Sequence, residues 1–305
     1  MKQSAIRANE FTDDPYPSRN GIPPAIIERK DPVVYGANST ASPLTQTQLE
    51  QYREQGFLVL ENLFRDNEIA ALQQEMVKLR TDPQLHNAEE TITEAGNGEV
   101  RTIFRVHALS GVFSKLSADE RLTGIARYLL DDQVYIHQSR LNYKPGFRGK
   151  EFYWHSDFET WHVEDGMPRM RALSMLITLT ENYACNGSLM LIPQSHHQYV
   201  VCDGETPENH FKASLKKQEI GTPEDKFLEQ LVNRGGIITA TAKPGSVILF
   251  DCNLIHGSNS NITPHPRSNV FFVYNAISNA VTEPFCNRPP RPEYICTRRN
   301  IRPID

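Results

Sequence analysis

The sequence lacks the features of membrane, secreted and nucleic-acid-binding proteins. Its 305 residues contain no apolar run near the roughly 18–20 residues that a membrane helix needs. The first residues, MKQSAIRANEFTDD, include no apolar segment of the kind found in a secretory signal. The formal net charge of −5 argues against a nucleic-acid partner, because such partners usually require a basic surface. We therefore expect a cytoplasmic protein that contacts neither membrane nor nucleic acid.

Cysteine is also scarce, and its spacing argues against a zinc or disulfide framework. The chain has five cysteines, an odd number, and no CxxC motif. Free cysteines mostly behave as small buried hydrophobic residues. We expect reduced thiols without a catalytic role at all five positions, which are Cys185, Cys202, Cys252, Cys286 and Cys296.

Two regions of the chain differ in composition. Residues 1–43 are rich in Pro, Asn, Asp and Arg and show no sustained hydrophobic period, which predicts an extended or wrapped arm. Residues 44–305 are expected to form a single domain, since a β-sandwich or barrel with added helices can reach this size. Within this domain, residues 203–233 are polar and compatible with helix, so we expect an insertion or lid there.

The first part of the domain predicts three helices and one strand. Residues 47–50, TQLE, match a capping box before a short helix that ends at Gly56, and residues 57–60 follow as a strand. Asp66 is expected to cap the second helix, and residues 117–120, SADE, the third. Apolar side chains at helical spacing mark the buried faces of these two helices: Ile69, Leu72, Met76 and Leu79, then Leu122, Ile125 and Leu129.

From about residue 134 the pattern changes to short β-type segments separated by Gly, Pro and Asn. Many short strands with such turns are typical of a sandwich or barrel. We therefore expect a mainly β fold with flanking helices, built on a double-stranded β-helix, which is a jelly-roll or cupin-like core. The expected strands are residues 134–143, 152–161, 172–179, 188–192, 237–242, 247–250 and 269–276.

Three polar residues suggest a metal site. His155 and Asp157 lie two residues apart in a predicted strand, so their side chains should project from the same face. His256 follows the β-type run at residues 245–250. Two histidines and one carboxylate on one side of a metal are typical of non-haem iron(II) oxygenases, because co-substrate and O₂ need adjacent vacant positions. We predict that these three residues bind iron(II) and activate O₂; a rival set built on His137 lacks this spacing.

An arginine downstream of the predicted ligands points to the co-substrate. Arg267 lies eleven residues after His256 and precedes the last predicted strand. A 2-oxo acid that chelates iron has a second carboxylate, which a guanidinium group can bind through two hydrogen bonds. Arg267 therefore suggests a 2-oxoglutarate site, with a surface salt bridge as the alternative.

Other side chains of the predicted strands are candidates for substrate contacts. Trp161 shares the strand parity of the first two ligands and should face the cavity, where an indole can bound a small substrate or stack on a cationic one. Gln138, Asn142 and Lys144 share one face of the preceding strand. Polar residues there bind either substrate and co-substrate or one another, because burying them without partners is costly.

Several segments resemble a known enzyme family. The order HxD…H…R, with residues 186–196, NGSLMLIPQSH, between, resembles the phytanoyl-CoA dioxygenase-like branch of the Fe(II)/2-oxoglutarate dioxygenases. Residues 152–168, FYWHSDFETWHVEDGMP, resemble the signature of the ectoine hydroxylases within that branch. Residues 138–147, QSRLNYKPGF, and 98–104, GEVRTIF, are also similar to theirs. The resemblance covers roughly residues 45–295.

The resemblance implies a reaction, a ligand set and a homodimer. L-ectoine would be hydroxylated to 5-hydroxyectoine while 2-oxoglutarate and O₂ become succinate and CO₂. Iron would be bound by His155, Asp157 and His256. The 2-oxoglutarate contacts would be Arg267, Asn142, Ser258 and Phe104. The ectoine contacts would be Gln138, Trp161, Thr160, Phe271 and one arginine, either Arg288 or Arg291.

Two alternatives to this function remain open. The same chemistry could act on another small amino-acid derivative. A non-catalytic jelly-roll binding protein is the alternative from another class. A non-catalytic protein of this kind would be expected to lack one residue of the triad or the downstream arginine. The sequence contains the whole triad and the arginine.

Overall fold

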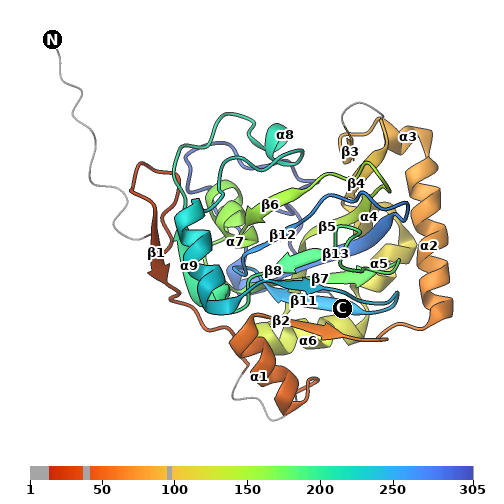
Figure 1. Ribbon diagram of the computed structural model, residues 1–305, viewed down its shortest axis with the longest axis horizontal. Helices are drawn as coiled ribbons and strands as arrows, with labels where there is room; N and C mark the ends of the chain where they lie inside the picture. The colour runs from red at the N-terminus through yellow and green to blue at the C-terminus, as the bar shows by residue number, and fades with distance from the viewer. Residues whose placement is uncertain (1–13, 37–41, 95–97, 305) are drawn as a thin grey trace.

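Strands that are distant in the sequence assemble into antiparallel sheets (Figure 1). The computed structural model describes residues 14–36, 42–94 and 98–304. The larger sheet has seven strands, in the order β2 (Phe57–Leu60), β11 (Val247–Asp251), β7 (Ala172–Thr178), β13 (Arg267–Ala276), β5 (Val134–Lys144), β4 (Val100–Phe104) and β3 (Thr91–Thr93). The smaller sheet has four, in the order β10 (Ile238–Ala240), β8 (Leu189–Leu191), β12 (His256–Ser258) and β6 (Phe152–His155).

Alternate residues of the larger sheet face two different apolar cores. On β11, Val247 and Leu249 belong to an outer core, whereas Ile248 and Phe250 belong to an inner one. This follows the two-residue period of a strand. The inner core also contains Leu191 and other residues of the smaller sheet, so the two sheets pack face to face. The observed architecture is therefore antiparallel sheets with flanking helices, which confirms the predicted class at that level.

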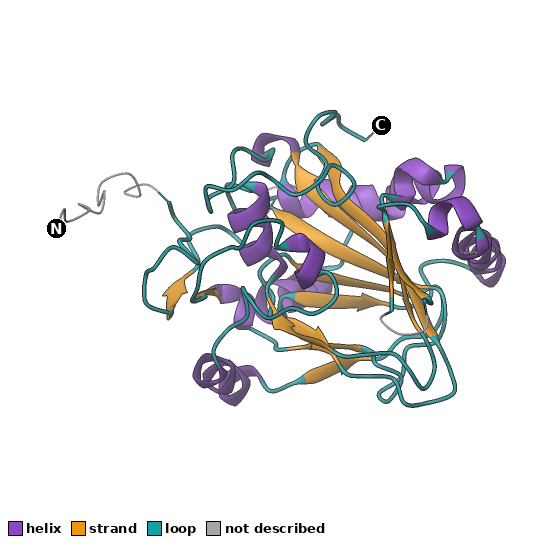
Figure 2. Ribbon diagram, turned by 90° about the horizontal axis from the view of Figure 1, so that it is seen from above, coloured by secondary structure: helices purple, strands orange, loops and turns teal. Residues whose placement is uncertain are grey.

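Helices cover the outer face of the larger sheet (Figure 2). The outer core joins this face to the apolar sides of α2 (Asp66–Thr81), α5 (Gly111–Ser117) and α6 (Glu120–Leu130). The residues predicted to be buried on α2 and α6 are all buried. The remaining helical segments are α1 (Gln46–Gln55), α3 (Pro83–His86), α4 (Val106–Leu109), α7 (Asp157–Thr160), a π-helix (Trp161–Asp165), α8 (Phe211–Ser214), α9 (Asp225–Gly235) and 3₁₀ turns at Ser195–His197 and Ile277–Asn279.

The N-terminal caps of three helices lie one or two residues away from the positions that the sequence predicted. Thr45 caps α1, one half-turn before the predicted TQLE box: its hydroxyl accepts from Gln48 N at 3.3 Å, and Gln48 Oε1 accepts from Thr45 N at 2.9 Å. Asp66 is the first residue of α2 rather than its cap. Asp119 caps α6, because the expected Ser117 is the last residue of the preceding helix.

The segment predicted as one strand over residues 152–161 changes structure in its middle. β6 ends at His155, and α7 begins at Asp157. Ser156 caps this helix by accepting a hydrogen bond from Glu159 N at 3.4 Å. The two residues have the S-x-x-E spacing of a capping box, a helix signal that outweighs the strand alternation. The strand-parity argument for Asp157 and Trp161 was therefore wrong, although both residues do line the pocket.

The described parts of the N-terminal arm and of the insertion pack against the sheets. β1 (Ala25–Glu28), at one side of the molecule in Figure 1, pairs in antiparallel fashion with β9 (Gln198–Val201). Residues 1–13 and 37–41 of the arm lie outside the described part. The insertion supplies α8 and most of α9, and its residue Gln218 reaches the pocket. None of the helices in the described ranges has both the length and the apolar character to span a bilayer.

Candidate metal centre and pocket

The two predicted histidine ligands lie opposite each other in the smaller sheet. His155, at the end of β6, is the cross-strand partner of His256, at the start of β12. Their ring centroids are 4.2 Å apart. Asp157, in the first turn of α7, completes the group: its Oδ1 lies 3.7 Å from His155 Nε2 and 3.9 Å from His256 Nε2. One ligand atom from each residue falls within 4.8 Å of the others, so the structure brings the predicted triad together.

Backbone carbonyl groups set the tautomer of both imidazoles. His155 Nδ1 lies 2.8 Å from Tyr153 O, and His256 Nδ1 lies 2.9 Å from Leu254 O. A carbonyl oxygen can only accept, so each Nδ1 carries a proton, and in the neutral ring the lone pair is on Nε2, which faces Asp157. Metal-binding histidines are typically oriented in this way. Burial and the neighbouring His155 lower the pKa of His256 to about 4, which keeps it neutral.

The carboxylate of Asp157 is held in its charged form. Burial alone would raise its pKa, but the nearby imidazoles and Arg140 outweigh burial and lower it. Ser174 Oγ donates to Asp157 Oδ2 at 3.3 Å and leaves Oδ1 facing the histidines. Two imidazoles and one carboxylate match the donor set of a mononuclear iron(II) site with open positions.

The pocket beside the triad lies between the two sheets and is rich in positive charge. Four arginines and one lysine line it, against two carboxylates, Asp157 and Glu94. Arg101 Nε lies 3.8 Å from Glu94, and Arg140 acts on Asp157. The pocket therefore favours anionic small molecules. The five basic residues are Arg101, Arg140, Lys144, Arg267 and Arg291.

Arg267 is buried in the pocket with an unused hydrogen-bond donor. It is the first residue of β13 and only 3% exposed, and its Nε has no partner among the residues that the structure describes. Burial lowers its pKa to about 10, so it stays charged at neutral pH. Because a buried, unsatisfied cation is costly, this group is suited to a ligand carboxylate.

Two further predicted co-substrate contacts lie near Arg267. Asn142 and Ser258 line the same pocket, and Lys144, the cross-strand partner of Arg267, donates to Ser258 Oγ at 2.9 Å. Burial, with Arg267 and Arg101 close by, lowers the pKa of Lys144 to about 6. Predicted residue Phe104 is different: its side chain is buried outside the pocket lining, and its ring packs on Tyr294.

The predicted ectoine contacts line the part of the pocket formed by β5, β13 and the π-helix. Gln138, Thr160, Trp161 and Phe271 all line it. Trp161 is 2% exposed and packs edge-on against the ring of His137, with centroids 5.2 Å apart. These contacts hold the indole in one orientation, as a pocket wall requires.

The structure separates the two arginines that the sequence left as alternatives. Arg291 lines the pocket, and Asp165 holds it through two hydrogen bonds, to Nε at 2.7 Å and to Nη2 at 2.5 Å. Arg288 lies outside that lining, in a separate depression beside Glu164, and donates to Thr206 O at 3.2 Å. Only Pro289 and Pro290 separate the two arginines, and the spacing in the sequence could not predict how the chain runs through this segment.

Sequence reasoning missed three kinds of pocket residue. Arg140 lies on the same face of β5 as Gln138 and Asn142, so strand parity could have identified it. Its guanidinium lies 4.5 Å from the centre of the Phe271 ring and donates to Gln138 Oε1 at 2.5 Å. Arg101 of β4 also lines the pocket and lies in the family-like segment 98–104, but its role was not predicted. Three insertion residues line the pocket without any motif to mark them; they are Ser214, Leu215 and Gln218.

A second group of potential ligands, His137, Asp165 and Cys296, is a chain of contacts rather than a metal site. All three are buried. His137 Nε2 lies 3.2 Å from Asp165 Oδ2, whereas its Nδ1 lies 3.9 Å from Cys296 Sγ. One ligand atom from each residue lies within 4.8 Å of the others, but both oxygens of Asp165 already accept hydrogen bonds from Arg291, so we assign the group to an internal polar network.

Comparison with known proteins agrees with this geometry. The family model for phytanoyl-CoA dioxygenase (PhyH) matches residues 52–269. An ectoine dioxygenase from Bordetella bronchiseptica is 55% identical over 295 residues, covering 96% of each chain. The crystal structure of EctD from S. alaskensis with 2-oxoglutarate and 5-hydroxyectoine has a TM-score of 0.87 at 48% identity, covering 95% of this chain and 97% of that one. A structure of the same protein with bound Fe has a TM-score of 0.86, also at 48% identity, with the same coverage. The chain belongs to the phytanoyl-CoA dioxygenase family and, within it, to the ectoine dioxygenases.

Proposed function

We propose that this protein hydroxylates L-ectoine to 5-hydroxyectoine. In the balanced reaction, L-ectoine, 2-oxoglutarate and O₂ give 5-hydroxyectoine, succinate and CO₂, with one oxygen atom entering each organic product. The observation that carries the proposal is the convergence of two imidazole Nε2 atoms and the Asp157 carboxylate in a pocket with a free arginine. The relationship to ectoine dioxygenases supports the choice of substrate.

The residues of the triad fit iron(II). His155, His256 and Asp157 would bind it, and the bound metal supplies the O₂ activation that an inert C–H bond requires. The protein orients both imidazoles through the carbonyl groups of Tyr153 and Leu254. It also keeps the carboxylate charged, so the donor set is organised before the metal binds.

The cationic part of the pocket suits 2-oxoglutarate. Arg267 would bind the distal carboxylate through its unused donors, and Asn142 and Ser258 would add hydrogen bonds beside it. Lys144 lies next to Ser258 and adds positive charge when protonated. The burial of this site strengthens each interaction, because little water competes for the donors.

Ectoine would occupy the part of the pocket beside Trp161. Its ring carries a delocalised positive charge that the indole face can stabilise, and Gln138 and Thr160 supply hydrogen-bonding groups. Arg291 would bind its carboxylate. Leu215 and Gln218 of the insertion cover the pocket and would limit the entry of water during the reaction.

Four further predictions accompany this function. We propose that the two facing sheets form a double-stranded β-helix, in a domain that spans residues 44–305. We also propose a cytoplasmic location and a homodimer. Sedimentation of the purified protein tests the dimer, since a monomer at micromolar concentration would contradict it.

The decisive experiment is mass spectrometry of the product after incubation with iron(II), 2-oxoglutarate, O₂ and L-ectoine. We expect ectoine to gain one oxygen atom with an equal amount of succinate released. Succinate release only with another amino-acid derivative would refute ectoine as the substrate. Asp157→Ala should abolish turnover while the far-ultraviolet circular dichroism is retained. The exposed carboxylate variant Asp203→Ala should behave as the wild type.

A further inference from the structure

Side-chain and backbone hydrogen bonds hold the segment that leads into the ligand His256. It comprises residues 252–255, between β11 and β12. Asp251, the last residue of β11, organises it: its Oδ1 accepts from Asn253 N at 2.8 Å, and its backbone oxygen accepts from Leu254 N at 3.0 Å. The path of the chain into His256 therefore depends on how firmly Asp251 and Asn253 are held, in addition to the pairing of His256 within the smaller sheet.

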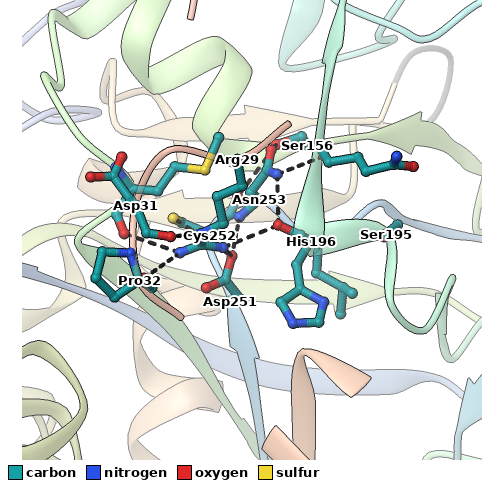
Figure 3. A network of polar contacts seen from close by, with 12 residues as sticks. Arg29, Asp31, Pro32, Ser156, Ser195, His196, Asp251, Cys252 and Asn253 are labelled. Carbon is teal, nitrogen blue, oxygen red and sulfur yellow. Dashed lines mark hydrogen bonds and ion pairs between the residues drawn. The ribbon is translucent and has the colours of Figure 1, made fainter. Parts of the chain in front are cut away.

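Asn253 joins this segment to the one that carries the other two ligands (Figure 3). Its Oδ1 accepts from Ser156 Oγ at 3.1 Å, and Ser156 lies between His155 and Asp157 in the sequence. Its Nδ2 donates to the backbone oxygens of His196 at 3.1 Å and Gln198 at 2.9 Å. The side chain is 1% exposed, so both ends of the amide are used within the protein.

Arg29, from the N-terminal arm, completes the network from the other side (Figure 3). Its Nη1 donates to Asp251 Oδ1 at 2.8 Å and to His196 O at 3.2 Å. Three more of its N–H groups donate to the backbone oxygens of Asp31, Pro32 and Met170, at 2.9, 3.1 and 3.2 Å. All five guanidinium donors thus have an acceptor, and the side chains of Arg29 and Asp251 are 4% and 2% exposed.

From this network we infer that Arg29 is a positioning residue for the metal site. It acts through Asp251 and Asn253, which fix the segment before His256 against Ser156 and so support the spacing that the pairing of His256 with His155 establishes. The arm is therefore part of the site's architecture, although Arg29 precedes residues 52–269, which the family model matches. A lysine cannot replace Arg29 fully, because an ammonium group has three donors and cannot reach five separated acceptors.

This inference rests on the proposed metal site, so the experiment that tests it measures metal binding directly. Cobalt(II) is titrated into the full-length, metal-free protein without oxygen, and its d–d absorption gives the dissociation constant. Supporting residues around a metal site typically change affinity by about 10- to 100-fold. We expect Arg29→Met to raise the constant by about that factor, and Arg29→Lys to raise it less.

Arg121 provides a matched control on the outer side of the larger sheet. It pairs with Glu68 and Asp119 and donates to Leu63 O. We expect Arg121→Met to lower the thermal midpoint of the metal-free protein and to leave the cobalt constant unchanged. An unchanged constant in Arg29→Met, or the same rise in both variants, would overturn the inference.

Asn253→Ala and Arg29→Lys keep the inference testable where Arg29→Met does not fold. Each should weaken cobalt binding, and the double variant should weaken it by less than the product of the two effects, because one residue acts through the other. Fully multiplicative effects would show that Arg29 does not act through Asn253. If the wild type binds no cobalt, the proposed metal site itself is refuted. This outcome differs from one in which the wild type binds cobalt and the variants bind it equally well, which refutes only the positioning role of Arg29.

Discussion

Arg19 and Glu159 form a buried, two-point ion pair between the N-terminal arm and α7. Arg19 Nε donates to Glu159 Oε1 at 2.8 Å, and Nη2 to Oε2 at 2.5 Å. The side chains are 0% and 1% exposed. Arg19 also contacts Glu164 of the π-helix through Nη1 at 2.6 Å, so it holds the helical segments that carry Asp157 and Trp161.

Replacing Arg19 should strongly destabilise the fold. Arg19→Met leaves two carboxylates buried without their cation, and such a change costs roughly 3–5 kcal/mol. Urea unfolding monitored by circular dichroism measures the loss. The control is Lys217→Met, whose pair with Glu219 is exposed and should contribute little to stability. Equal losses in both variants would contradict the role of burial.

Glu164 should make the free energy of unfolding decrease as the pH falls through the acid range. Burial would raise its pKa, but His210, Arg19 and Arg291 outweigh burial and lower it to about 2. Because the pKa is lower in the folded state, the carboxylate stabilises the protein above about pH 4.5, and this stabilisation disappears as pH falls towards 2. It amounts to about 3 kcal/mol.

Urea unfolding between pH 6 and pH 2 measures this contribution. Glu164→Gln should unfold at a lower urea concentration at pH 6 and show a shallower loss of stability on acidification. Glu219→Gln, at an exposed carboxylate, should follow the wild type. A Glu164→Gln curve parallel to that of the wild type would refute the assignment.

Arg267→Ala should weaken 2-oxoglutarate binding selectively. A hydrogen bond to a charged group contributes about 1.5–3 kcal/mol, so KM for 2-oxoglutarate should rise at least about tenfold. KM for ectoine should change far less. Arg267→Lys should recover only part of the loss, because lysine lacks the two-point geometry. Succinate release at varied 2-oxoglutarate concentration measures the effect, and an equal rise in both KM values would contradict it.

Arg291 and Arg288 should differ in their effect on ectoine. Arg291→Ala removes the pocket guanidinium that Asp165 holds, so we expect KM for ectoine to rise about tenfold or more. Arg288→Ala removes a side chain outside the pocket lining and serves as the matched control, with wild-type KM expected. A rise confined to Arg288→Ala would show that the segment moves when substrate binds.

Trp161→Ala should affect ectoine more than 2-oxoglutarate. Loss of the indole face removes roughly 1–2 kcal/mol of stacking on a cationic ring, or about tenfold in affinity. Trp154 is the other tryptophan and packs in a separate apolar cluster, so Trp154→Phe is the control. Isothermal titration of each ligand measures the affinities. Equal losses for both ligands would indicate that Trp161 acts only in packing.

Parts of the fold and of the site could be predicted from the sequence because they depend on short-range patterns. Ile69, Leu72 and Met76 follow the helical period and are buried as expected. The spacing of His155 and Asp157 also identified a pair that the structure brings together, but for a reason that the structure corrects, since Asp157 belongs to a helix capped by Ser156. Two competing local signals were present, and the chain follows the helical one after His155.

The residues that no pattern marked are those whose partners are distant in sequence. Arg19 and Arg29 lie more than a hundred residues from Glu159 and Asp251, and nothing in the composition of the arm pairs them. The same applies to Arg291, because its place in the pocket depends on a contact with Asp165.

The sequence by itself determined the chemistry of this protein: two histidines, one aspartate and a downstream arginine define the donor set, and their motifs indicate the family. The tertiary structure decided which side chains meet. Only it shows that the imidazoles face Asp157 through Nε2, that Arg267 has an unused donor, and that Arg29 braces the segment before His256. The physical reason is that donor type is a local property of a residue, whereas distance, burial and hydrogen-bond satisfaction arise only when remote segments pack together.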